Sequence, residues 1–187
     1  MTPLSDRFVT EIELEFPRFR IVKKRDSALS RVIDVLLKVL TFGAQSAFMT
    51  HYHTVLWDTL YVPDLWETTP DVARLVTLHH ERVHLRQRRR YGDFVMTFLY
   101  LVPFFPIGLA YGRARIEWEA YRETIRATAR YRGLAAARSL DLRRHIIRQF
   151  TSGAYGWMWP FPKVLDRWYD VALAELPANS DKPLADA

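Results

Sequence analysis

The order of apolar and polar positions along the chain predicts a series of elements separated by breaks that contain Gly or Pro. Residues 7–24 alternate polar and apolar side chains, which favours an extended segment or a short pair of strands. The run RVIDVLLKVLTF, residues 31–42, has a broad apolar face and predicts a helix. Ser27 or Ser30 is the expected N-cap of this helix, and Gly43 its expected end.

Two strands are expected before the best-defined helix of the chain. Residues 46–63, SAFMTHYHTVLWDTLYVP, are rich in Thr, Tyr, Val and Trp, which predicts two short strands around residues 57–58. The second of them ends at Pro63 and is expected to form a sheet edge. Thr69 as N-cap and Pro70 at the first helical position then predict a helix that runs to about Arg90.

The second half of the chain is expected to be helical. A long helix is predicted over residues 113–131, with an end at Gly133, and another over 134–149. An aromatic loop follows, and a short helix is expected near residues 164–176. The remaining tail, 177–187, has little to bury and is expected to be disordered. The pattern favours one domain over residues 1–176 with an α+β fold, mainly helical, and a small antiparallel sheet.

The most apolar segment covers residues 94–112, FVMTFLYLVPFFPIGLAYG, and carries no formal charge. Its length is that of a membrane-spanning helix, but Pro103 and Pro106 interrupt it, and proline in a helix interior costs about 3 kcal/mol. We therefore expect a helical hairpin that is buried, with peripheral contact to a membrane as the alternative. The N-terminus lacks the pattern of a secretory signal, so the expected location is the cytoplasm.

The composition excludes some kinds of active site and metal site, but it does not select one class of binding partner. The 27 Lys and Arg residues exceed the 21 Asp and Glu residues, a balance that suits nucleic acid, anionic membranes or acidic peptides alike. The chain has no cysteine, so disulfides, thiolate metal sites and cysteine nucleophiles are excluded. Any metal must be bound by imidazole, carboxylate or water.

The segment LHHERVHLRQ, residues 78–87, contains the pattern His-Glu-x-x-His. Residues four apart share one helix face, so His80 and His84 can present ring nitrogens to a single zinc ion. Glu81 lies about 100° round the helix, where its carboxylate can act as the general base towards a metal-activated water. His79 projects to the other side of His80 and is expected to take no part.

A catalytic zinc ion normally has three protein ligands, and the third must come from elsewhere in the chain. The downstream segment RIEWEAYRET carries Glu117, Glu119 and Glu123. Glu119 and Glu123 share a face, whereas Glu117 points nearly opposite to Glu119. The surrounding arginines leave an exposed, salt-bridged helix as the alternative interpretation.

The combination of His80-Glu81-x-x-His84 with Glu119-Ala120-x-x-Glu123 resembles the gluzincin metallopeptidases. The additional Gln87 and the form Glu-x-Glu-Ala look closer to small bacterial peptidases of the minigluzincin-like group. The resemblance implies a zincin-like fold, a zinc ion bound by His80, His84 and Glu119, and Glu81 as the general base. It also implies an edge strand, here the one that ends at Pro63, which binds a peptide or protein substrate. Thermolysin-type members have Asp at the position of Glu123, for which a second-shell role is the expectation.

The remaining candidates are side chains that lie outside the histidine helix. A hydrogen-bond donor for the oxyanion is expected at Tyr155, which two glycines flank, with His145 as the other candidate. His51 and His53 alternate in a predicted strand and are interpreted as ordinary surface histidines. The leading hypothesis is a zinc metallopeptidase. The alternatives are a zinc-stabilised scaffold without catalysis and an arginine-rich protein that binds nucleic acid or anionic membranes.

Overall fold

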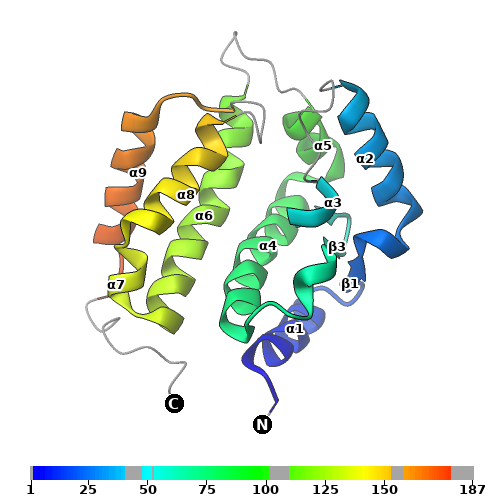
Figure 1. Cartoon of the computed structure of the whole chain (residues 1–187), viewed down its shortest axis with the longest axis horizontal. Coiled ribbons are helices and arrows are strands. Elements are labelled where there is room, and N and C mark those ends of the chain that lie inside the picture. The colour runs from blue at the N-terminus through cyan, green and yellow to red at the C-terminus, as the bar shows by residue number, and fades with distance from the viewer. Residues whose placement is uncertain (1, 41–47, 52, 102–109, 153–157, 178–187) are drawn as a thin grey trace. The chain divides into compact units, whose positions relative to one another are not determined.

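The computed structural model describes residues 2–40, 48–51, 53–101, 110–152 and 158–177. The chain divides into two compact units, an N-terminal unit, Met1–Leu85, and a C-terminal unit, Arg86–Ala187. The division falls inside one continuous helix, which contributes residues to both units. Figure 1 shows that the described part is mainly helical. With one small sheet, it is an α+β protein.

The N-terminal unit begins with helix α1, Leu4–Glu15, where the sequence pattern predicted strand. That prediction was wrong because Phe8 and Ile12, the buried apolar residues of the segment, are four apart and so share one helix face, whereas Leu14 is 80% exposed. Only Arg20–Lys23, the strand β1, is extended as expected.

A three-stranded mixed sheet forms the β part of this unit. Its strands are β1, β2 (Thr54–Leu56) and β3 (Thr59–Val62), and they lie side by side in the order β1-β3-β2. The hairpin of β2 and β3 around residues 57–58 confirms the prediction, but β1 pairs with β3 in parallel, so the expected antiparallel sheet was only partly right. The expectation that the strand ending at Pro63 forms an edge was wrong: β3 is central, and all four of its residues are buried.

The other short elements of this unit lie between the strands. Helix α2, Ala28–Leu40, begins after Ser27, whose hydroxyl accepts a hydrogen bond from the Ser30 amide at 3.1 Å, so Ser27 is the N-cap and Ser30 lies inside the helix. Gly43, its expected end, lies outside the described residues. Helix α3, Phe48–His51, replaces the start of a predicted strand. Two 3-10 turns, η1 and η2, cover Lys24–Asp26 and Asp64–Trp66.

Helix α4, Asp71–Tyr91, carries the His-Glu-x-x-His pattern, as predicted. It begins directly after Pro70 and is followed by Gly92, whose φ of 80° is a conformation that glycine adopts without strain. The hydroxyl of Thr69, the expected N-cap, donates instead to the carbonyl of Leu65 at 2.8 Å.

The start of α4 is tied to the start of α1. The Asp71 carboxylate accepts hydrogen bonds from the backbone amides of Leu4, at 2.9 Å, and Ser5, at 3.2 Å, and from the Ser5 hydroxyl. Burial opposes the ionisation of Asp71, but these hydrogen bonds outweigh it and lower the pKa of the carboxyl. A side chain of α4 thus caps the N-terminus of another helix.

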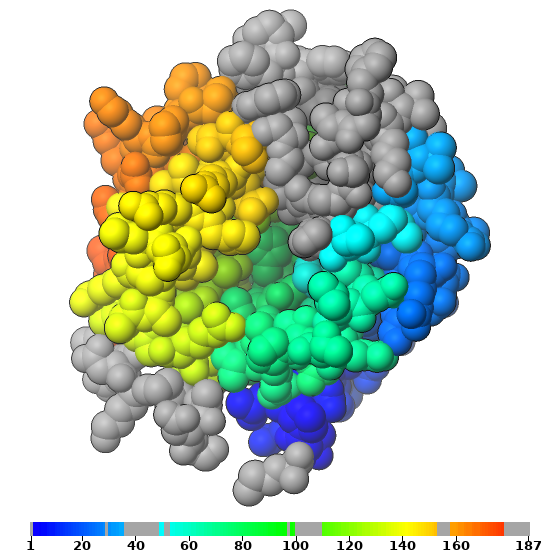
Figure 2. Space-filling model, viewed as in Figure 1, coloured from blue at the N-terminus to red at the C-terminus, as the bar shows by residue number. Residues whose placement is uncertain are grey.

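The described part of the C-terminal unit holds five further helices. They are α5, Asp93–Leu101; α6, Tyr111–Arg132; α7, Leu134–Ala137; α8, Leu140–Thr151; and α9, Pro162–Ala174. The predicted helix over 134–149 is split in two, because the Ser139 hydroxyl accepts a hydrogen bond from the Leu142 amide and so caps a new helix. In the space-filling view, α8 (yellow) and α9 (orange) form adjoining surfaces (Figure 2).

An aromatic and aliphatic core holds α6, α8 and α9 together. Phe150 is fully buried, and its ring lies 6.1 Å from that of Trp118 and 5.5 Å from that of Tyr121. The hydroxyl of Tyr169, which is also fully buried, donates to the carbonyl of Ala137 at 2.7 Å. This core is apolar apart from the hydroxyl and indole groups of its tyrosine and tryptophan side chains.

The apolar segment, residues 94–112, was expected to form a helical hairpin. Helices α5 and α6 confirm the helical parts, and residues 102–109 between them lie outside the described residues. No helix in the described part of the chain has both the length and the apolarity that a membrane crossing requires. The tail beyond Pro177 is likewise not described.

Candidate metal site

The two histidines of the pattern converge on one point beside α4. Their Nε2 atoms are 3.2 Å apart, and their ring centroids are 5.0 Å apart. Two nitrogen ligands at about 2.0–2.1 Å from a tetrahedral zinc ion would be about 3.3 Å apart. The side chains of His80 and His84 therefore already have the separation that two ligands of one zinc ion require.

A third ligand must come from another element, and α6 of the C-terminal unit carries a buried carboxylate, Glu117. We call His80, His84 and Glu117 the ligand group. Glu117 and His84 are buried, with exposed fractions of 4% and 7%. Two imidazoles and one carboxylate form a donor set that zinc takes in catalytic sites, so the residues present fit this ion.

Glu119, the third ligand that the family resemblance implied, forms a hydrogen bond with Gln87. The Gln87 amide nitrogen donates to the Glu119 carboxylate at 2.9 Å and to the Ile116 carbonyl at 3.0 Å. Gln87 follows His84 by three residues and shares its helix face. The contact therefore holds the Glu-x-Glu segment of α6 beside the last turns of α4, and the assignment of Glu119 as a ligand stays a prediction.

Glu81, the expected general base, is 6% exposed and has a buried lysine nearby. Lys24 is fully buried; burial lowers its pKa to about 7, against the opposing effect of the charges of Glu81 and Asp34. Sequence reasoning missed Lys24, because lysine side chains are almost always exposed and nothing in the local pattern marks this one as different.

His79 belongs to the packing of α1 and not to the ligand group. Its ring stacks on that of Phe8, with centroids 4.1 Å apart and an interplanar angle of 20°. Arg82 lies over the same Phe8 ring at 5.1 Å and pairs with Glu15 at 2.6 Å. This is in line with the expectation that His79 stands apart, and it shows that α1 supports the opposite side of the histidine helix.

The other expected site residues are not part of the ligand group. Glu123 is half-buried and forms an ion pair with Arg126 at 3.9 Å, so its second-shell role stays a prediction. His145 is an exposed residue of α8. Tyr155 lies outside the described residues, so the identity of an oxyanion donor also stays a prediction.

The sequence pattern suggested that His51 and His53 alternate in one strand, but the structure does not place them in a strand. His51 ends α3, and His53 precedes β2. The ring of His53 meets that of Trp66 edge to face at a centroid distance of 5.3 Å. Burial, and secondarily the charge of Lys24, lower the pKa of His53 to about 4, so this imidazole is neutral at physiological pH.

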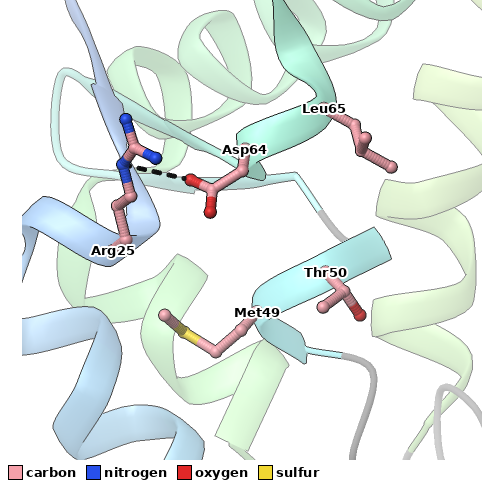
Figure 3. Close-up of a pocket in the computed structure, with 5 residues that line it drawn as sticks. All are labelled: Arg25, Met49, Thr50, Asp64 and Leu65. Carbon is pink, nitrogen blue, oxygen red and sulfur yellow. Dashed lines mark ion pairs between the residues drawn. The ribbon is translucent and has the colours of Figure 1, made fainter.

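A separate hollow of the N-terminal unit lies among η1, α3 and η2 (Figure 3). Arg25 and Asp64 face each other across it and form an ion pair at 3.4 Å, and Met49, Thr50 and Leu65 complete its lining. Because the two charged groups satisfy each other and no further titratable group lines the hollow, we assign no chemistry to it.

Several arginines of the arginine-rich helix faces form ion pairs, which the sequence did not predict. Arg82 is paired with Glu15, Arg88 with Asp93, and Arg143 with Asp166 and Asp170. These pairs remove part of the continuous basic surface that a nucleic-acid ligand would require. Comparisons of this chain with family models, with curated protein sequences and with solved structures found no match.

Proposed function

We propose that this chain is a zinc-dependent metallopeptidase of zincin-like fold, with His80, His84 and Glu117 as zinc ligands and Glu81 as the general base. The observation that carries the proposal is the separation of 3.2 Å between the Nε2 atoms of His80 and His84, which suits two ligands of one zinc ion. A bound zinc ion would lower the pKa of a water molecule towards neutrality and polarise the substrate carbonyl.

The buried glutamate supplies the proton chemistry in this proposal. The Glu81 carboxylate accepts a proton from the attacking water and delivers it to the nitrogen of the leaving amine. Its low exposure, 6%, keeps bulk water away from the carboxylate. The charge of Glu81 favours the protonated form of the nearby Lys24.

The substrate class in this proposal is a peptide in extended conformation. An added strand must pair with a sheet edge, and the edges of the described sheet are β1 and β2. The first expectation placed the peptide along the strand that ends at Pro63, which is central and already paired on both sides. An extended peptide in the proposed enzyme therefore pairs with β1 or β2.

Metal analysis of the purified protein tests the ligand set. We expect about one zinc ion per chain in wild type. His80→Ala and Glu117→Gln are expected to lose it, whereas Glu119→Gln and the matched control His79→Ala are expected to retain it. If Glu117→Gln retains zinc and Glu119→Gln loses it, the third zinc ligand is Glu119 and not Glu117. A chain that binds no zinc after loading would refute the site.

Peptide cleavage tests the catalytic assignment independently of metal binding. The zinc-loaded protein is incubated with a mixture of unstructured peptides, and cleavage is followed by mass spectrometry. Glu81→Gln is expected to keep its zinc and to lose at least about 100-fold in rate, because general-base catalysis contributes 10²–10⁴-fold. Cleavage that persists in Glu81→Gln would contradict the role of Glu81.

A non-catalytic zinc-stabilised scaffold is the second candidate function. It is favoured by the burial of Glu81 and its interaction with the charge of Lys24, since a carboxylate engaged by a buried ammonium group is less free to move a proton. The scaffold predicts that zinc removal lowers the unfolding temperature and that no peptide is cleaved in the presence or absence of zinc.

A further inference from the structure

One corner of the C-terminal unit exposes large apolar side chains together with arginines. Phe94, Val95 and Phe98 of α5 are 84%, 42% and 56% exposed, and Tyr91 at the end of α4 is 38% exposed. The preceding residues, Arg89 and Arg90, are also exposed. We call these six residues the corner patch. An exposed apolar cluster next to a charged rim is typical of an interaction surface.

The local backbone places these side chains together. Phe94, Val95 and Phe98 occupy positions i, i+1 and i+4 of α5 and therefore lie on one side of it. Gly92, with a φ of 80°, forms the bend between α4 and α5. An ion pair between Arg88 and Asp93 spans this bend and joins the two helix ends.

The charge of the corner patch is positive and is not neutralised locally. Arg88 is paired with Asp93, the only acidic residue of α5. Within the described part of the chain no carboxylate pairs with Arg89 or Arg90, and the guanidinium of Arg90 lies over the Tyr91 ring at 5.3 Å. Two cationic groups thus border three exposed apolar side chains.

We propose that the corner patch binds the surface of an anionic phospholipid bilayer. Phe94 and Phe98 insert between acyl chains near the headgroups, and Arg89 and Arg90 bind lipid phosphates. This arrangement of apolar and basic groups is that of an interfacial helix, which lies in the membrane surface and does not cross it. The proposal does not depend on the metal site.

Charge complementarity favours an anionic bilayer over a second copy of the chain. In a symmetric dimer through this patch, each copy would present the same surface, and two pairs of arginines would face each other across a desolvated contact. An anionic bilayer offers negative charge beside an apolar layer, and each arginine near such a surface contributes about 1 kcal/mol of attraction.

Vesicle flotation tests the proposal with the full chain. Wild type is expected to float with vesicles of phosphatidylcholine and phosphatidylglycerol, to remain unbound with phosphatidylcholine alone, and to dissociate at high salt. Arg89→Gln/Arg90→Gln is expected to weaken binding by about 25-fold, since 1 kcal/mol corresponds to about fivefold for each arginine. Phe94→Ser is expected to weaken it by about tenfold, because the ring no longer leaves water.

Matched controls separate the corner patch from general charge and apolarity. Leu14→Ser removes a side chain that is 80% exposed on α1, and Arg132→Gln removes an exposed arginine at the end of α6. Both variants, and Glu81→Gln, are expected to bind vesicles as wild type does. Circular dichroism verifies that each variant retains its helices.

Three outcomes would overturn the proposal. Equal binding to neutral and anionic vesicles would show that the arginines do not contribute. Binding that survives both corner-patch variants would place the lipid contact elsewhere. Failure to bind vesicles, with a concentration-dependent dimer that Phe94→Ser dissolves in sedimentation analysis, would assign the corner patch to a second copy of the chain.

Discussion

The two units of the chain differ in what they bury. In the N-terminal unit, the buried side chains include ionisable groups from three separate elements, among them Lys24, Asp34 and Glu81. In the C-terminal unit, α6, α8 and α9 enclose aromatic and aliphatic side chains, and Glu117 is the buried acid among its described residues. Burying ionisable groups lowers stability unless they are paired, so we expect the N-terminal unit to respond to pH and the C-terminal unit to respond to the loss of apolar volume.

The units also differ in backbone strain. The positive φ angles of the C-terminal unit, 80° and 85°, occur at Gly92 and Gly133, where they cost little. Among the described residues of the N-terminal unit, the positive φ angle, 52°, occurs at Trp57. Strain and buried charge are both features that proteins retain near functional sites. The strained Trp57 and most of the buried ionisable side chains belong to the unit that contains the histidine pair.

The largest expected effect tests the C-terminal core. Phe150→Ala removes a fully buried ring that contacts Trp118 and Tyr121, and we expect the free energy of unfolding to fall by about 3–5 kcal/mol. Phe161→Ala, at a ring that is 47% exposed, is the control and should cost about 1 kcal/mol or less. Urea denaturation measures both. A loss below about 1 kcal/mol for Phe150→Ala would show that the stability of the C-terminal unit does not depend on its buried aromatic side chains as we expect.

The next effect is the pH dependence that a buried lysine confers. The pKa of Lys24 is lowered from 10.5 to about 7 in the folded protein. Between these values the unfolded chain binds more protons than the folded chain, so stability rises with pH. The slope is about 1.4 kcal/mol per pH unit, or about 2 kcal/mol between pH of about 7 and about 9.

The slope, and not the absolute stability, identifies Lys24 as the source. In Lys24→Met this rise should disappear, even if the loss of the ammonium group next to Glu81 lowers stability at every pH. Lys163→Met, at an exposed lysine of α9, should leave the slope unchanged. Denaturation curves at several pH values measure the three slopes, and an equal rise in Lys24→Met would assign the pH dependence to another group.

A smaller effect is expected at the polar tie between α1 and α4. Asp71→Ala removes the acceptor of three hydrogen bonds from Leu4 and Ser5, and we expect a loss of about 1–2 kcal/mol, the range for a lost helix cap. Asp6→Ala, at an exposed acid of α1, is the matched control.

The stability that the Asp71 hydrogen bonds contribute is expected to depend on pH in the acidic range. The pKa of Asp71 is lowered in the folded state, so its contribution is complete above its ordinary value of 3.8 and is lost as the pH falls through the lowered value. The difference in stability between wild type and Asp71→Ala should therefore shrink below pH of about 4. A difference that is constant with pH would show that packing, and not the ionised carboxylate, is responsible.

Helix boundaries were predictable where breakers and caps coincide with periodicity. Pro70 and Gly92 delimit α4, and Gly133 ends α6, so both helices were placed correctly from local signals. Residues 4–15 were misread because alternating apolar residues also satisfy a helical spacing of four at Phe8 and Ile12. The central position of β3 was not predictable locally, since its partner β1 lies about 40 residues earlier in the chain.

The part of the candidate site that depends on local helix geometry was predictable, and the part that depends on tertiary packing was not. His80 and His84 are four apart on one helix, so their convergence follows from helix geometry alone. The choice between Glu117 and Glu119 depends on how a second helix is rotated, which the Gln87 contact influences and the local pattern does not contain. Lys24 was missed because its burial depends on tertiary packing.

The smallest expected effect isolates the strain at Trp57. A residue with a Cβ atom in the left-handed region costs about 1–2 kcal/mol relative to its usual conformation, and glycine does not. Because Trp57 is 55% exposed, removing its ring sacrifices little buried area. Trp57→Gly and Trp57→Ala both remove the ring, but only alanine keeps the steric cost, so Trp57→Gly should be more stable than Trp57→Ala by about 1 kcal/mol. Equal unfolding free energies for the two variants would show that the β2–β3 turn relaxes at no cost, and that the contrast in strain between the two units has no energetic content.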